Sequence, residues 1–123
     1  MIETEIYAYL SSNNAITALV GNRIYPLILP KNYTLPAITY TKISGPRVNA
    51  KDGQTGLANP RFQFSCWAKT YLEAKRVADA VRIAMNTFPN GTTYMQDEQD
   101  FYEPDTGLYH VPVDFTIWHN ENI

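Results

Sequence analysis

The sequence predicts an α+β fold in which helices pack on one face of an antiparallel or mixed β-sheet. Over residues 62–68 apolar side chains occupy every second position, which is the period of a strand with one face on a core. Over residues 71–88 they recur every three or four positions, which is the period of an amphipathic helix. We expect residues 1–123 to form one domain, because a chain of this length can bury a core without stapling disulfides.

Residues 1–21 predict two helices. Apolar side chains follow helical spacing over residues 2–10, and the polar run of residues 11–14 ends that pattern. Asn14 is placed to cap a second, short helix, and Gly21 can adopt the left-handed conformation that ends helices. Two helical elements therefore precede the first strand.

A brief strand over residues 23–25 and an irregular arm over residues 27–35 are expected next. Prolines at the start, middle and end of this stretch interrupt regular pairing. The apolar residues of the arm need to be covered, and a neighbouring subunit could cover them. They are therefore candidate contact residues: Leu27, Ile28 and Leu29.

Strands are predicted over residues 37–44 and 61–68, with a long polar segment between them. Residues 45–60 contain three Gly and two Pro but only two sizeable apolar side chains, so their contacts can offset little of the entropy of ordering. We expect a mobile loop or a long hairpin that is ordered by partners. Four polar or charged residues of this segment are candidate contacts: Arg47, Lys51, Asp52 and Gln54.

A capping box opens the helix over residues 71–88. The Thr70 hydroxyl can accept from the Glu73 amide, and the Glu73 carboxylate can accept from the Thr70 amide. Leu72 and Ile83 share a side of the helix well off the core stripe, and we expect them to be buried at the helix margin. The core stripe itself contains Ala74, Val77, Ala78, Val81, Ala84, Met85 and Phe88.

Two further strands are expected over residues 93–99 and 108–119, which gives the order ααβββαββ, or the same order without the brief first strand. The last strand alternates between apolar and polar positions, and its Pro112 lacks a ladder donor, which predicts a sheet edge or a bulge. Trp67 and Trp118 fall on the polar series of their strands. Two explanations stay open: a partner covers this sheet face in an assembly, or a loop of the same chain covers it.

Composition and motifs argue against several classes of protein. The net charge of −2 and the scattered Lys and Arg lack the basic footprint of a sequence-specific nucleic-acid binder. Acidic residues near the N-terminus and the lack of an apolar run of about 20 residues argue against export and membrane insertion. Cys66, the single cysteine, lies on an apolar series and is expected to be structural. The sequence holds no phosphate loop, metal-ligand motif or nucleophile motif, so we expect no catalytic residue, cofactor or metal.

Four stretches of the sequence together resemble the tail-completion family of long-tailed bacteriophages. They are GNRIYP (residues 21–26), LPAITYTKISG (35–45), FQFSCWAKTYLEAKRVADAVR (62–82) and DFYEPDTGLYHVPVDFTIW (100–118), so the resemblance spans nearly the whole chain. It implies a small, non-enzymatic structural protein, similar to lambda-type tail terminators and to tail-to-head joining proteins. Such proteins form a ring, commonly of six subunits.

The resemblance also implies where the protein acts and what it binds. The implied place is the head-proximal end of the tail tube in the virion, after assembly in the host cytoplasm. The implied partners are further copies of the chain, the tail tube protein and the head connector or neck proteins, with DNA able to pass through the ring lumen. The candidate contacts with a subunit or the tail tube are then Leu27, Ile28, Leu29, Arg47, Lys51, Asp52, Gln54, Trp67, Leu72, Ile83 and Trp118.

Two alternatives to this interpretation stay open. A head-completion or neck protein on the capsid side would have the same fold signals. A small α+β module that binds RNA or another ligand belongs to a different class, and it needs basic and aromatic residues on one exposed sheet face. Only Arg61, Trp67 and Trp118 fit that requirement.

Overall fold

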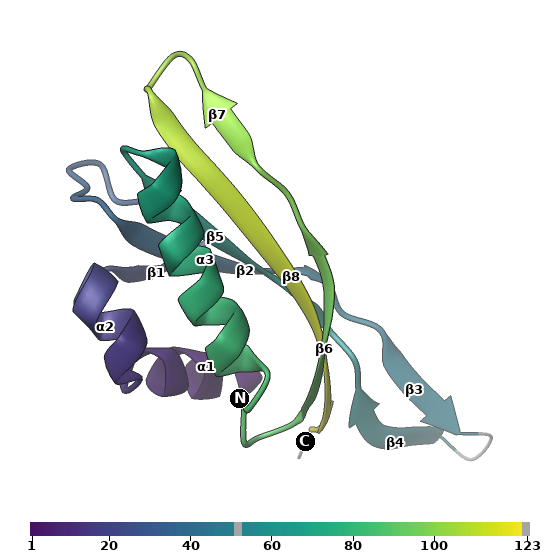
Figure 1. The fold of residues 1–123 in the computed structure, drawn as a ribbon. Coiled ribbons are helices and arrows are strands. Elements are labelled where there is room, and N and C mark those ends of the chain that lie inside the picture. The colour runs from purple at the N-terminus through teal and green to yellow at the C-terminus, as the bar shows by residue number, and fades with distance from the viewer. Residues whose placement is uncertain (51–52, 122–123) are drawn as a thin grey trace.

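The computed structural model describes residues 1–50 and 53–121, and for residues 48–55 it does not describe the side chains. Figure 1 shows α3 lying along the sheet, with α1 and α2 packed beside it. Two predicted contact residues, Lys51 and Asp52, lie outside the described residues, and Gln54 is placed by its backbone alone. The elements are α1 (Ile2–Ser11), α2 (Asn14–Val20), β1 (Ile24–Pro26), β2 (Ala37–Ser44), β3 (Arg47–Ala50), β4 (Gly53–Ala58), β5 (Arg61–Ala68), α3 (Tyr71–Met85), β6 (Thr92–Glu98), β7 (Phe101–Glu103) and β8 (Leu108–Asn120).

The order of the elements extends the predicted one. All predicted helices and strands are present, and β3, β4 and β7 are additional strands. The cap of α2 is Asn13 and not Asn14, because the Asn13 side chain accepts from the Ile16 amide at 3.1 Å. As predicted, the Thr70 hydroxyl accepts from the Glu73 amide at the start of α3. The helix ends at Met85, a turn earlier than predicted.

The sheet is mixed, and its centre is β8. β1 pairs with β2 in parallel, and the other pairings described are antiparallel. The order runs β1-β2-β5-β8, with β6 and β7 on the far side of β8. Helices on one face of a mixed sheet confirm the predicted α+β class.

The described part of residues 45–60 contains two paired antiparallel strands, as in the long hairpin that was one of the two predictions for this segment. Arg47 of β3 pairs with Ala58 of β4, which continues the β2–β5 pairing beyond Ser44 and Arg61. β4 also pairs with the C-terminal end of β8. In Figure 1 β3 and β4 project to one side of the body of the protein.

Of the two predictions for Pro112, a sheet edge or a bulge, the sheet edge is wrong, because β8 is paired on both sides. The irregularity in the pairing of β6 with β8 lies between Met95 and Asp97 of β6. Pro112 lies opposite Ser65 of β5, and its carbonyl accepts from the Gln99 amide at 3.2 Å. The amide and carbonyl of a strand residue point to the same side, so the missing donor faces Gln99 and Asp100. These two residues are the gap between β6 and β7. The neighbouring strand is thus interrupted where proline cannot donate.

The core lies between the helices and the sheet. Cys66 is fully buried in it, and burial raises the pKa of its thiol, which supports the structural role predicted for it. The alternating apolar residues of β5 and β8 face α3. The predicted stripe of α3 and the turn after it is buried throughout: Ala74, Val77, Ala78, Val81, Ala84, Met85 and Phe88.

Candidate interaction surfaces

The arm after β1 presents two apolar side chains to solvent. Leu27 and Ile28 are 69% and 76% exposed, and Leu29 is half-buried. Leu27 has a φ of 67°, and the Ile28 amide donates to the Pro26 carbonyl at 2.8 Å, so the backbone makes a γ-turn around Leu27. A left-handed conformation costs an L-residue roughly 1–2 kcal/mol. The strained turn therefore displays two apolar residues, which we call the apolar tip.

The sheet face away from the helices is partly closed by its own side chains. Trp67 stacks on His110 with ring centroids 3.9 Å apart, and its Nε1 donates to the Thr39 hydroxyl at 3.0 Å. Burial holds the pKa of His110 below its ordinary value, so the stacked imidazole is neutral near pH 7. Trp67 is thus covered by a side chain of a neighbouring strand, while Trp118 on the same face stays partly exposed.

The expectation that Leu72 and Ile83 are buried at the helix margin is wrong. They are 60% and 61% exposed on the outer side of α3. The buried side of α3 that contacts the sheet is formed by other residues, and Leu72 and Ile83 lie outside it. They remain candidate contact residues.

The strands β6 and β7 form an edge of the sheet with exposed aromatic side chains that sequence analysis did not single out. Phe101 lies opposite His110 on the face away from the helices, and Tyr102 lies opposite Tyr109 on the helix face. The Phe101-Tyr102 pair was the available signal, but β7 is too short for an alternating pattern to show. We define the aromatic edge as the three exposed aromatic residues of these strands and one exposed methionine beside them: Tyr94, Phe101, Tyr102 and Met95.

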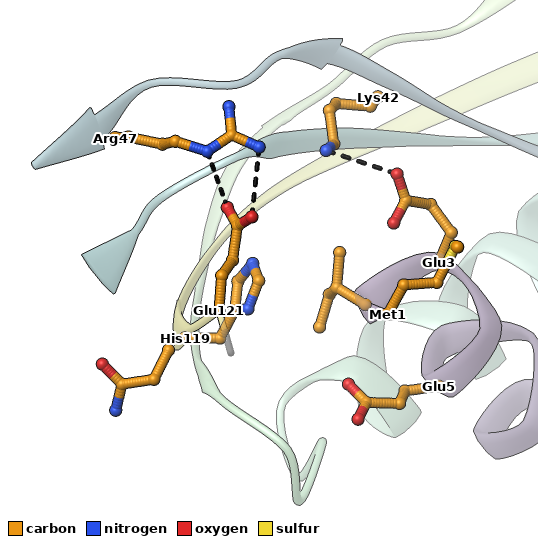
Figure 2. Close-up of a pocket in the computed structure, with 9 residues that line it drawn as sticks. Met1, Glu3, Glu5, Lys42, Arg47, His119 and Glu121 are labelled. Carbon is orange, nitrogen blue, oxygen red and sulfur yellow. Dashed lines mark hydrogen bonds and ion pairs between the residues drawn. The ribbon is translucent and has the colours of Figure 1, made fainter. Parts of the chain in front are cut away.

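A pocket of about 410 Å³ lies between α1, the base of the hairpin and the end of β8 (Figure 2). Lys42 Nζ lies 3.3 Å from the Glu3 carboxylate, and Arg47 Nε lies 3.0 Å from the Glu121 carboxylate. Although burial alone would raise the pKa of Glu3, its backbone and Lys42 hydrogen bonds hold that pKa below its ordinary value. Both basic side chains are therefore engaged within the chain. The sequence could not show this pocket, because its lining comes from three distant segments.

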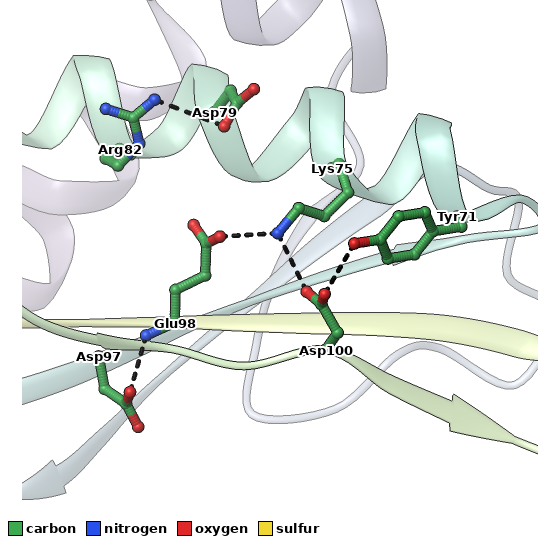
Figure 3. Close-up of polar contacts among 7 residues, drawn as sticks. All are labelled: Tyr71, Lys75, Asp79, Arg82, Asp97, Glu98 and Asp100. Atoms are coloured by element: carbon green, nitrogen blue, oxygen red, sulfur yellow. Dashed lines mark hydrogen bonds and ion pairs between the residues drawn. The ribbon is translucent and has the colours of Figure 1, made fainter.

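A polar cluster ties α3 to the edge of the sheet (Figure 3). Lys75 Nζ lies 2.7 Å from the Glu98 carboxylate and 3.0 Å from the Asp100 carboxylate, and the Tyr71 hydroxyl donates to Asp100 at 2.8 Å. The hydrogen bond from Tyr71 and then that from Lys75 lower the pKa of Asp100. The same contact with Asp100 raises the pKa of Tyr71. Glu98 and Asp100 flank the gap between β6 and β7, so the cluster fixes the interrupted strand against the helix.

Replacing Lys75 with Met should lower the free energy of unfolding by about 1 kcal/mol near neutral pH, because the ion pairs are only partly exposed and share one cation. The folded-state pKa of Asp100 is depressed, so its stabilising effect is present above the ordinary Asp pKa and is lost as pH falls through the folded value. The difference in stability between wild type and variant should therefore shrink in acid. Urea titrations at several pH values would measure it.

Arg82→Met is the matched control for the Lys75 variant. Arg82 pairs with Asp79 at 3.4 Å on the exposed side of the same helix, and such pairs contribute little. The free energy of unfolding of the Arg82→Met variant should stay within about 0.5 kcal/mol of the wild-type value. Equal losses in the two variants would mean that helix propensity, and not the cluster, explains the effect.

The described residues do not assemble a metal site, since they contain no group of three or more His, Cys, Asp or Glu that could hold an ion. Among the helices of the described chain, none combines the length and apolarity needed to cross a bilayer. The prominent features of the described surface are the apolar tip, the outer side of α3 and the aromatic edge. These features define a class: a small α+β protein whose exposed surfaces suit assembly with other chains.

Comparison with known proteins identifies the family. The family model "Tail completion protein gp17" matches residues 4–120, so the chain belongs to this tail-completion family. A solved chain from the virion of a native gene transfer agent particle shares the fold, with a TM-score of 0.80 over 97% of this chain and 94% of that chain at 16% identity. No curated protein matches the sequence.

A second solved chain is similar only in part. It comes from Akkermansia muciniphila, was solved without its transmembrane region, and matches 68% of this chain and 46% of its own at 9% identity. Its TM-score of 0.37 is too low to support an argument.

Family membership confirms the interpretation that the sequence suggested. The protein is a structural tail-completion protein of a phage-type virion, associated with the tail. This favours a structural, non-enzymatic role over the RNA-binding or ligand-binding module that the sequence left open.

Proposed function

We propose that this protein forms a ring on the head-proximal end of the tail tube, stops tube growth there and offers a docking surface to the head. The observation that carries the proposal is the family match over residues 4–120. The proposed partners are further copies of the chain, commonly six in a ring, the tail tube protein and the head connector or neck proteins. The ring acts by binding, without turnover, and DNA passes through its lumen.

The proposed mechanism is occupation of a growth surface. A tail tube grows because each layer presents the surface on which the next layer docks head to tail. A ring seated on the last layer covers that surface, so further tube subunits cannot add. The other side of the ring is then free for the connector.

The projecting hairpin supports contact with the tube or the lumen. β3 and β4 extend away from the helices and the core, so they can reach a neighbouring layer without disturbing the fold. Arg47 at the base of the hairpin pairs with Glu121, just after the end of β8. We assign the hairpin contacts to the segment that contains Arg47, Lys51, Asp52 and Gln54.

A phage from which this gene is deleted tests the proposal. It should produce full capsids and tail tubes that do not join, with many tubes longer than in the wild type, and its titre should fall to background. Electron microscopy of lysates measures tube length and joining. Wild-type protein supplied in trans should restore both.

The outcomes separate the possible roles. Overlong tubes support termination. Tubes of normal length that stay detached would replace termination with a joining or neck role. Infectious particles at wild-type titre without the protein would overturn both.

A further inference from the structure

Two segments of the chain each carry charged side chains of one sign only. Residues 6–50 carry four charged side chains, all basic, and residues 90–107 carry five, all acidic. The first segment contains β1 and its arm, and the second contains β6 and β7. The sheet runs from β1 through β2, β5 and β8 to β6 and β7, so β1 with its arm and β6 with β7 lie at opposite edges (Figure 1). Of the four basic residues, Arg23 and Lys31 flank β1, whereas Lys42 of β2 and Arg47 of β3 lie away from that edge.

The charges that remain unpaired sharpen this division. Lys75 neutralises Glu98 and Asp100, so these two acids are satisfied within the chain. Asp97, Glu103 and Asp105 have no ion-pair partner among the described residues. On the opposite edge, Lys31 likewise has none in the part of the chain that the structure describes, and Arg23 is engaged only by the Pro36 carbonyl. The charged residues without an ion-pair partner are therefore basic at the β1 edge, Arg23 and Lys31, and acidic at the β6–β7 edge, Asp97, Glu103 and Asp105.

The apolar exposure follows the same division. The apolar tip, Leu27 and Ile28, lies at the end of β1, and the aromatic edge lies on β6 and β7. Each edge thus combines exposed apolar side chains with unpaired charge, and the signs are opposite. Such a combination fits an interface with an apolar centre and a charged rim.

The β1 edge is suited to side-chain contact and not to strand pairing. The Ile24 amide donates to the Asn22 carbonyl at 2.9 Å. Pro26 has no amide hydrogen, and its carbonyl already accepts from Ile28. These backbone groups cannot extend the sheet, so the exposed tip is left as the contact element.

We propose that the apolar tip of one copy packs on the aromatic edge of a second copy of this chain, with Arg23 and Lys31 facing the acids of that edge. The inference rests on the proposed function, because a ring needs one head-to-tail contact repeated around an axis. Two different surfaces at opposite edges of a subunit supply such a contact, and each subunit then uses its tip once and its edge once. The strained turn at Leu27 preforms the tip, so little conformational entropy is lost on docking.

Cysteine cross-linking tests the proposal directly. Cys66 is the single cysteine and is buried, so a bismaleimide reagent reacts with introduced cysteines. Ile28→Cys and Tyr102→Cys should each give no dimer alone at high protein concentration, and their mixture should give a 1:1 dimer. The variant with both substitutions should give a ladder of higher multimers. Leu72→Cys and Ile83→Cys, on the exposed side of α3, serve as matched controls.

The possible results decide the proposal. Self-cross-linking of Ile28→Cys would overturn it in favour of a two-fold contact between tips. Cross-linking through Leu72→Cys or Ile83→Cys without any in the Ile28 and Tyr102 mixture would move the interface to α3. No cross-link in any combination would also overturn it. Higher salt should reduce the yield of the mixed dimer several-fold, because the charged rim is screened.

Leu27→Gly separates contact from folding. Glycine adopts the left-handed conformation without strain, so the unfolding midpoint should be unchanged or higher, whereas self-association should weaken at least tenfold. Unchanged association would remove Leu27 from the interface. Because these measurements use purified protein, they stand apart from the phage deletion: loss of tail length control without cross-linking would keep the proposed function and discard this contact.

Discussion

Phe64→Ala is expected to lower the free energy of unfolding by about 4 kcal/mol. Phe64 is fully buried in the middle of β5, where its ring lies 6.5 Å from that of Phe62 and 6.3 Å from that of Phe115. The surrounding side chains belong to strands and a helix that are fixed on several sides, so they can fill little of the cavity. A loss of this size is a large share of the 5–15 kcal/mol that stabilises an ordinary domain.

Urea denaturation followed by circular dichroism would measure this effect. Tyr94→Ala is the matched control, because it removes an exposed aromatic ring from β6 and should change stability by less than about 0.5 kcal/mol. A loss below about 2 kcal/mol for the Phe64 variant would show that the core collapses into the cavity.

Arg61→Met is expected to cost about 2 kcal/mol, for an electrostatic reason. Asp114 of β8 is only 6% exposed, and Arg61 of β5 donates to its Oδ2 through Nε at 3.1 Å and through Nη2 at 2.9 Å. Without the guanidinium, a nearly buried carboxylate is left without a cation. Fully buried pairs lose about 3–5 kcal/mol when one partner is removed, and the partial exposure of Arg61 lowers the expected figure.

The double variant Arg61→Met with Asp114→Asn identifies the cause. If the uncompensated carboxylate produces the loss, the second substitution should recover at least half of it. An equal loss in the single and double variants would point instead to packing of the Arg61 stem. Arg47→Met is the matched control, because its pair with Glu121 is more exposed and should contribute within about 0.5 kcal/mol.

The sequence predicts the parts of the fold that local periodicity specifies. Three features could be predicted because each depends only on residues that are near one another in the sequence. They are the alternation over residues 62–68, the cap at Thr70 and the apolar stripe of α3. β7 was missed because three residues are too few for a period. The central place of Pro112 was missed because it depends on a gap in a different strand, and periodicity reports nothing of neighbouring strands.

The contact surfaces were predictable to a smaller extent. The exposure of Leu27 and Ile28 followed from prolines that exclude them from a strand. Trp67 was correctly placed on the face away from the helices, but its cover is His110, which is adjacent only through the pairing of β5 with β8. Lys75 lies outside the predicted core stripe of α3, and its contact with Glu98 depends on where β6 ends. Predicting which side chains meet across neighbouring strands requires the register of strand pairing, and a single sequence does not specify that register.

The pairing of β8 with β4, β5, β6 and β7 has a consequence for synthesis on the ribosome. β5 is complete at Ala68, but the strand beside it ends at Asn120, about fifty residues later. At translation rates of roughly 5–20 residues per second, the edge of β5 that pairs with β8 stays unpaired for several seconds before β8 emerges. Over that interval the free edge of β5 and the apolar side of α3 that packs on β8 stay exposed. Nascent chains should therefore be most prone to aggregation, and most dependent on chaperones, just before residues 108–120 leave the exit tunnel.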